Sequence, residues 1–207
     1  MRHVTIVVTG LGRVGSAFVR LLEEKADACR LRYGLDLELH AVLRRDGGLF
    51  SHKRHGLLGL GSIAKEAAAA HPAWNSGLTL AEALSILDHG VLVECTPTDL
   101  ETGEPGLGHM RAAIHAGWNI AAASKGALVL RYGELFEQAA SRGVQIKYSG
   151  ATAAALPTLD TGTYALAGAE ITAIDGILTG TTNHILGRME EGLSFDDALR
   201  EAQAKGI

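Results

Sequence analysis

Apolar runs of strand length alternate with helical apolar periodicity through the first part of the chain. The run 3–9 is β-branched and almost wholly apolar, which is typical of a strand covered on both faces of a parallel sheet. From Val14 to Leu22 the apolar residues recur at helical spacing instead. Further strands are predicted at 35–43, 90–94, 119–123 and 144–148, and further helices at 79–87, between Pro105 and Gly117, and at 131–142. The alternation predicts an α/β fold with a doubly wound, mostly parallel Rossmann-type sheet.

The hydrophobic pattern changes after residue 148. The elements expected beyond it are a helix at 156–166, a long strand at 171–178 and helices at 183–191 and 194–205. We therefore predict two domains, a Rossmann-type domain at 1–148 and the start of an α+β domain at 149–207. The second domain is too short to cover both faces of the predicted apolar strand 171–178. We therefore expect a homodimer, in which a second copy of the chain would cover them.

Composition and charge narrow the class of protein. The chain has 207 residues, 47% of them hydrophobic, with a net charge of −4, so a sizeable core is possible and a nucleic-acid partner is not expected. Only Cys29 and Cys95 occur, without the spacing of a disulfide scaffold or a zinc site. The first apolar run is too short for a signal peptide or a membrane span. We expect a cytoplasmic protein that does not contact a membrane.

A glycine fingerprint follows the first predicted strand and opens the first predicted helix. Gly10 permits a tight turn, Gly12 lets the backbone approach a pyrophosphate, and Gly15 allows close packing of helix on strand. Arg13 and Val14, between the last two glycines, would present first-turn amides to the phosphates. In this context Gly-x-Gly-x-x-Gly indicates NAD(P) binding more strongly than a turn needed only for packing.

The end of the second predicted strand indicates which dinucleotide binds. Arg44 and Arg45 stand where an acidic residue would bind the ribose 2′-hydroxyl of NAD, and Lys53 follows in a predicted surface loop, 44–61. These cations would donate charge-assisted hydrogen bonds to a 2′-phosphate. NADP is therefore the expected cofactor, while the carboxylate of Asp46 leaves NAD possible.

Several later segments resemble homoserine dehydrogenase in order and spacing, and the match runs through essentially the whole chain. Ala122-Ala-Ser-Lys-Gly126 and the Gly-Thr-x-Asn-x-Ile-Leu stretch that begins at Gly180 are the most distinctive. The other matching segments are Cys95-Thr-Pro-Thr-Asp99 with Pro105 and His109, Ser149-Gly-Ala-Thr152 with Leu156-Pro157, and Asp196 to Gln203.

This resemblance implies hydride transfer between NAD(P) and the pair L-homoserine and L-aspartate 4-semialdehyde, in the aspartate branch that leads to threonine and methionine. It implies that Lys125 is the catalytic lysine between cofactor and substrate, although Ser124 replaces the asparagine of the common Ala-Asn-Lys form. Thr96 would lie beside the nicotinamide ribose. Gly180 and Thr181 would lie on the substrate side.

Two departures from the family pattern keep alternatives open. The family's later glutamate, aspartate and second lysine would follow Ile207, so the chain as given is expected to bind cofactor and to have little or no activity. A truncated chain, a short homologue, a longer protein and a catalytically incomplete NADP(H) sensor all remain possible. Ser149 stands where many members have a glutamate associated with a monovalent cation, so no metal ligand is assigned.

Another semialdehyde dehydrogenase, with a cysteine nucleophile, is a further alternative. Cys95 is the better placed cysteine, but its neighbours offer no base, and a small core residue is the favoured interpretation. The nine histidines show no metal-ligand spacing in sequence.

Overall fold

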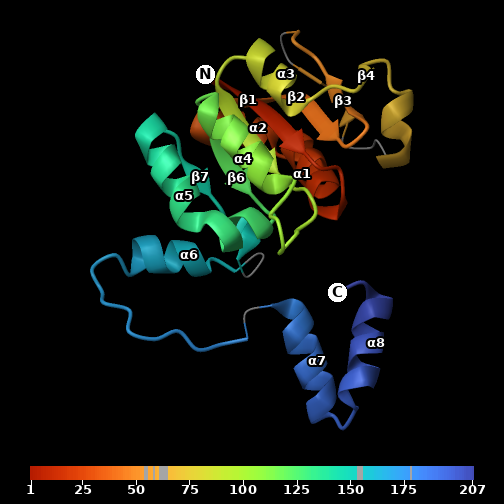
Figure 1. The fold of residues 1–207 in the computed structure, drawn as a ribbon, viewed down its shortest axis with the longest axis vertical. Coiled ribbons are helices and arrows are strands. Elements are labelled where there is room, and N and C mark those ends of the chain that lie inside the picture. Colours follow the sequence, from red (N-terminus) through yellow and green to blue (C-terminus); the bar gives the residue numbers. More distant parts are fainter. Residues whose placement is uncertain (54–55, 58, 61–64, 153–155, 178) are drawn as a thin grey trace. The chain divides into compact units, whose positions relative to one another are not determined.

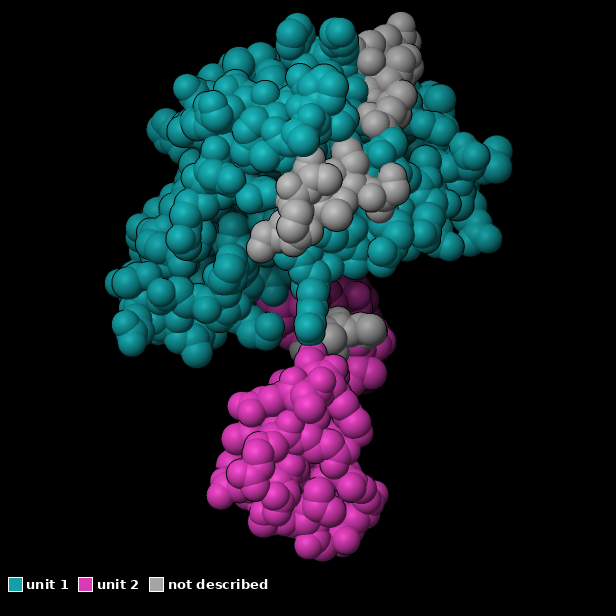
Figure 2. Space-filling view, turned by 90° about the vertical axis from the view of Figure 1, so that its right-hand side faces the viewer, with its two compact units in different colours: residues 1–148 teal, residues 149–207 magenta. Residues whose placement is uncertain are grey.

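The computed structural model describes residues 1–53, 56–57, 59–60, 65–152, 156–177 and 179–207. The chain divides into two compact units, Met1–Tyr148 and Ser149–Ile207, which are coloured separately in Figure 2.

The first unit is built on a seven-stranded sheet with the order β4-β3-β2-β1-β5-β6-β7 (Figure 1). The strands are β1 (Arg2–Thr9), β2 (Leu35–Arg44), β3 (Gly47–Phe50), β4 (Trp74–Ser76), β5 (Gly90–Glu94), β6 (Asn119–Ala122) and β7 (Ile146–Lys147). The pairs β1–β2, β1–β5, β5–β6 and β6–β7 are parallel, and the pairs β2–β3 and β3–β4 are antiparallel. The predicted doubly wound, mostly parallel α/β sheet is confirmed.

Among the described residues of this unit, five α-helices connect and cover the strands. They are α1 (Arg13–Glu24), α2 (Ala26–Tyr33), α3 (Leu80–Ile86), α4 (Gly106–His115) and α5 (Gly126–Arg142), and a 3-10 helix spans Lys65–Ala70. Val19 and Leu22 of α1 pack on Ile6 and Val8 of β1 in one buried cluster, as the apolar spacing of both segments requires. In Figure 1, α4 lies over the sheet and α5 lies beside α4. Among the helices of the described residues, none is long and apolar enough to cross a membrane.

Several boundaries in the first unit differ from the sequence prediction. The predicted loop 44–61 contains β3, because Leu49 is almost wholly buried and its strand pairs with β2; the part of that loop at 54–55, 58 and 61 lies outside the described residues. Helix α2 and strand β4 were not predicted. Helix α5 begins at Gly126 rather than Arg131, and the backbone of Arg131 within it is non-helical (φ −140°, ψ 33°).

The second unit consists of short helices. A 3-10 turn at Ser149–Ala151 is followed by α6 (Thr158–Asp160), which continues as a π-helical turn at Thr161–Ala165, and then by α7 (Gly180–Glu190) and α8 (Phe195–Lys205). The predicted strand at 171–178 is wrong for its described part, since 171–177 form no strand and are exposed. A strand needs a neighbouring strand for its backbone hydrogen bonds, and the described residues of this unit contain none.

Candidate functional site

The strand order places a crevice at the carboxyl ends of β1 and β5. The chain leaves β1 toward β2 on one side and later reaches β5 on the other, which is the switch point where open α/β sheets bind ligands. A groove lies there, lined by the turn after β1, the end of β2, the start of α3 and the loop after β5. Of the predicted cofactor residues, those that line the groove are Gly10, Gly12, Arg13, Val14, Arg44, Arg45 and Thr96.

The three glycines of the turn have distinct geometries. Gly10 has a φ of +90°, and an added Cβ would lie 2.5 Å from the carbonyl oxygen of Cys95, so only glycine lets the turn cross the end of β5. A Cβ on Gly15 would lie 1.9 Å from the carbonyl oxygen of Gly10, so this residue is buried for packing and does not line the groove. Gly12 is the N-cap of α1, and the space where its Cβ would lie holds no heavy atom within 4 Å. The start of α1 is therefore open toward the groove.

The end of β2 presents a pair of opposite charges rather than two open cations. The Arg44 guanidinium donates from Nε and from a terminal nitrogen to the two carboxylate oxygens of Asp46, each at 3.1 Å, and lies 5.5 Å from the centre of the Trp74 ring. Arg45 is exposed on the groove. Lys53 is exposed and is not among the residues that line it. Arg45 is thus the better placed candidate for a 2′-phosphate.

A buried carboxylate lies beneath the groove, and the sequence analysis did not single it out. Glu94 ends β5 and is completely buried. Its Oε1 accepts from the backbone N–H of Thr96 at 2.9 Å and from the Thr96 hydroxyl, and its Oε2 accepts from the Ser124 hydroxyl. A glutamate that ends an otherwise apolar strand was the available signal, because a charge is rarely buried without partners.

The environment of Glu94 favours its ionised form. Burial opposes ionisation most strongly, but the interactions with His109, Ser124 and Thr96 together outweigh it and keep the pKa of Glu94 below its ordinary value. His109 Nδ1 lies 3.9 Å from Glu94 Oε1, an ion-pair distance rather than a good hydrogen bond, and in the described structure this buried atom has no hydrogen-bond partner. His109 also lines the groove.

Lys125 lies next to this network. It precedes α5 as its N-cap, its side chain is exposed, and its backbone N–H donates to the Thr98 hydroxyl at 3.1 Å. Thr98 lines the groove, whereas Lys125 is not among the lining residues. Gly180 and Thr181 form the first turn of α7 in the second unit, where Thr179 caps the helix by accepting from the Thr182 N–H.

Cys95 has the environment of an inert thiol. Burial, with a further contribution from the nearby charge of Glu94, raises the pKa of Cys95 to about 12. A nucleophilic cysteine needs the opposite shift. The structure therefore disfavours the cysteine-dependent alternative.

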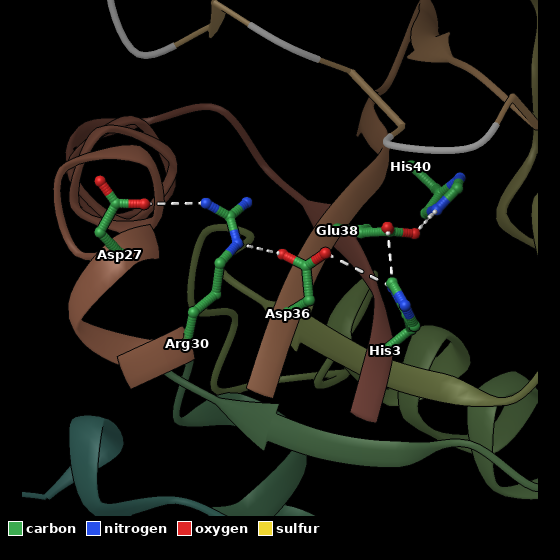
Figure 3. A network of polar contacts seen from close by, with 6 residues as sticks. All are labelled: His3, Asp27, Arg30, Asp36, Glu38 and His40. Carbon is green, nitrogen blue, oxygen red and sulfur yellow. Dashed lines mark hydrogen bonds and ion pairs between the residues drawn. The ribbon is translucent and has the colours of Figure 1, made fainter. Parts of the chain in front are cut away.

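A second polar cluster lies toward the amino ends of the neighbouring strands β1 and β2, opposite the ends that border the groove (Figure 3). His3 Nδ1 lies 3.0 Å from Glu38 Oε1 and 3.4 Å from Asp36 Oδ2, at a spacing that could hold a metal ion. Sequence spacing did not reveal the cluster because its members lie on neighbouring strands. Arg30 donates to Asp36 at 2.7 Å and His40 lies 3.4 Å from Glu38, so cations and imidazoles already balance both carboxylates. We assign the cluster a structural role.

The groove fits the phosphate and ribose portions of a dinucleotide. The first turn of α1 carries no acidic residue and Gly12 has no side chain, so helix amides and the positive end of the helix dipole face the groove. The side chains of His109 and the exposed Arg45 add polar groups along it. Fold and site together define the class of dinucleotide-binding α/β domains.

Family comparison identifies the chain within this class. Residues 10–149 match the family model described as homoserine dehydrogenase, NAD binding domain, and residues 157–207 match the homoserine dehydrogenase model. The chain belongs to the homoserine dehydrogenase family, as the resemblance of its motifs predicted.

Relatives match nearly the whole chain, but the chain spans about 60% of the length of those relatives. Homoserine dehydrogenase of Methanocaldococcus jannaschii is 32% identical over 98% of this chain and 61% of its own length. The NAD(+)-dependent homoserine dehydrogenase of Pseudomonas canavaninivorans is 32% identical over 100% of this chain and 59% of its own length.

Solved structures share the fold. A putative homoserine dehydrogenase of Archaeoglobus fulgidus superposes with a TM-score of 0.80 at 25% identity, over 98% of this chain and 60% of that one. A hyperthermophilic archaeal homoserine dehydrogenase in complex with NADPH gives a TM-score of 0.81 at 22% identity, over 99% of this chain and 62% of that one.

Proposed function

We propose that this chain supplies the cofactor domain and part of the substrate domain of an NADP-dependent homoserine dehydrogenase, which interconverts L-homoserine and L-aspartate 4-semialdehyde. The observation that carries the proposal is the groove at the β1/β5 switch point, with an open helix N-terminus on the Gly10-x-Gly12 turn, in a chain of this family. The bound dinucleotide would supply or accept the hydride.

The chain's own residues would bind and orient the reactants. The first-turn amides of α1, including those of Arg13 and Val14, would bind the pyrophosphate, and Gly15 would keep α1 close to the sheet. Arg45 would bind the 2′-phosphate, and the Thr96 hydroxyl would lie at the nicotinamide ribose. Lys125 would orient the substrate oxygen and stabilise the negative charge that develops on it.

NADP is the proposed cofactor, with NAD as the alternative. Arg45 favours a 2′-phosphate, but the Asp46 carboxylate lies on the same groove and can accept from a ribose hydroxyl. The similarity to an NAD(+)-dependent relative and to a structure solved with NADPH supports either choice. The Arg44 guanidinium already donates to Asp46, so it would have to donate to that carboxylate and to the 2′-phosphate at once. Lys53 does not line the groove and would have to reach it from its loop.

The two domains would have different roles, one in cofactor binding and the other in substrate binding and dimerisation. Residues 1–148 would bind NADP, while 149–207 would supply Gly180 and Thr181 to the substrate and take part in dimerisation. The exposed apolar side chains of Ile171, Ile174 and Ile177 support a homodimer, because a partner would cover them. The proposed location is the cytoplasm.

Catalysis is tested in the complete gene product with L-aspartate 4-semialdehyde and NADPH. Lys125→Ala should lower kcat by orders of magnitude if the ammonium acts in the transition state, or mainly raise KM if it only holds substrate. Exposed Lys147→Ala on β7 is the matched control, with an expected change below twofold. Unchanged kcat and KM in the Lys125 variant would refute its role, and absence of semialdehyde reduction by the unmodified enzyme would refute the substrate.

A further inference from the structure

The buried Glu94 carboxylate joins two loops that the proposed function uses separately. Its Oε1 binds the N–H and hydroxyl of Thr96, in the loop after β5, and its Oε2 binds the hydroxyl of Ser124, in the loop after β6. A carboxylate with no solvent exposure is tolerated only when such bonds replace its water. The two oxygens therefore hold the two loops in one arrangement.

Both loops lead directly to proposed ligand-binding groups. Thr96 lines the groove itself. Ser124 immediately precedes Lys125, whose backbone N–H donates back to the Thr98 hydroxyl at 3.1 Å. Glu94 thus fixes the start of the segment that carries Lys125 relative to the loop that carries Thr96.

Two glycines let α4 and α5 approach these loops closely. A Cβ on Gly106, at the start of α4, would lie 3.1 Å from the Ser124 hydroxyl and 3.2 Å from Glu94 Oε2. A Cβ on Gly126, at the start of α5, would lie 2.0 Å from the carbonyl oxygen of Asp99. The first residue of α4 therefore packs closely against the carboxylate network, and the first residue of α5 packs closely against the loop after β5.

We propose that Glu94 is a positioning residue that orders Thr96 and Lys125 for the nicotinamide half of the cofactor. The inference rests on the proposed function, since it takes the groove to be the dinucleotide site. Glu94 itself lies below the groove lining and does not touch the reactants. It acts through the hydroxyl groups that it holds.

The location of the network predicts a selective effect on binding. Gly12 at the start of α1 and Arg45 after β2 do not belong to the two loops that Glu94 joins, so a ligand with only the adenosine half should depend on Glu94 much less than a whole dinucleotide does. NADPH, which also carries the nicotinamide half, should depend on it. A role of Glu94 in general stability alone would not distinguish between the two ligands.

The test compares dissociation constants for NADPH and for 2′,5′-ADP, an adenosine fragment that retains the 2′-phosphate, by calorimetry. Glu94→Gln keeps the shape but removes the charge and replaces one acceptor oxygen with an amide N–H₂, so the hydroxyls of Thr96 and Ser124 would have to reorient, and Ser124→Ala removes one donor. We expect NADPH to bind at least tenfold more weakly to the first variant and about fivefold more weakly to the second, with 2′,5′-ADP changed less than twofold. Ser141→Ala, an exposed hydroxyl on α5, is the control.

The possible outcomes separate the inference from the proposed function. Equal losses for both ligands, or no loss for NADPH, would overturn the positioning role while leaving the cofactor site intact. Binding of neither ligand to the unmodified chain would overturn the proposed function and the inference with it. If Glu94→Gln does not fold, as judged by circular dichroism, the Ser124→Ala result decides alone.

Discussion

A negative charge at Gly12 should affect stability and cofactor binding in opposite directions. Gly12 is the N-cap of α1 with extended backbone (φ −83°, ψ −161°), which aspartate adopts readily, and no heavy atom lies within 4 Å of the position of an added Cβ. Gly12→Asp should therefore fold without a clash. Its carboxylate would interact with the helix dipole and stabilise the protein by about 0.3–1 kcal/mol.

The same carboxylate would oppose the pyrophosphate. One charge against two at about 6 Å costs about 1.4 kcal/mol at the dielectric constant of water and about 5.5 kcal/mol at an effective value of 20. The Kd for NADPH should therefore rise at least tenfold, since 1.4 kcal/mol corresponds to about a factor of ten.

The assay is calorimetric titration with NADPH, with a thermal melt of the unliganded protein in parallel. Gly133→Asp is the matched control, because Gly133 lies at an exposed position of α5 with equal room for a side chain. A Gly12→Asp protein that melts at or above the temperature of the unmodified chain and binds NADPH equally well would refute the placement of the pyrophosphate.

Three further predictions follow from the same groove. Arg45→Asp should lower the preference for NADPH over NADH at least tenfold in paired titrations, and an unchanged ratio would exclude Arg45 as the 2′-phosphate ligand. Alkylation of Cys95 by iodoacetamide at pH 8 should be roughly a thousandfold slower than that of a free thiol, because its pKa is raised to about 12, and rapid labelling in the native protein would contradict its burial. The pKa of Glu94 is lowered in the folded state, so its contribution to the free energy of unfolding is present above the unfolded pKa and is lost as pH falls through the folded pKa. In denaturant titrations below pH 5, the free energy of unfolding should therefore fall less steeply with decreasing pH in Glu94→Gln than in the unmodified chain. Identical pH curves would count against an ionised Glu94.

Sequence patterns predicted the features of this fold that depend on neighbours in the chain. The continuous apolar run of β1, the glycine turn after it and the start of the helix predicted at 79–87 are all local signals, and each corresponds to the element observed, the last with a Thr79–Glu82 capping box. A capping box places both partners within three residues, so no tertiary information is needed to find it.

Features that depend on distant segments were not predictable in this way. β3 is a strand because it pairs with β2, although its sequence, Gly47–Phe50, reads as part of a polar loop. The apolar segment 171–177 has the composition of a strand but no strand beside it among the described residues of its unit. Backbone hydrogen-bond partners, not composition alone, decide whether a strand forms.

The candidate site shows the same division. The glycine turn and Arg45 were identified from motif spacing, and the structure places both on the groove. Glu94 and Ser124 lie 30 residues apart in the chain and meet only because β5 and β6 are neighbours in the sheet. The bond between Arg44 and Asp46 was also missed, because adjacent charges in sequence do not reveal which of them will pair.

The groove at the β1/β5 switch point is assigned to a dinucleotide with a 2′-phosphate. Calorimetric titration of the 207-residue chain with NADPH and with NADH decides this assignment. One NADPH should bind per chain, and NADH should bind more weakly. Saturable binding of neither dinucleotide to a chain that melts cooperatively would contradict the dinucleotide assignment, and NADH binding as tight as or tighter than NADPH would refute the 2′-phosphate assignment.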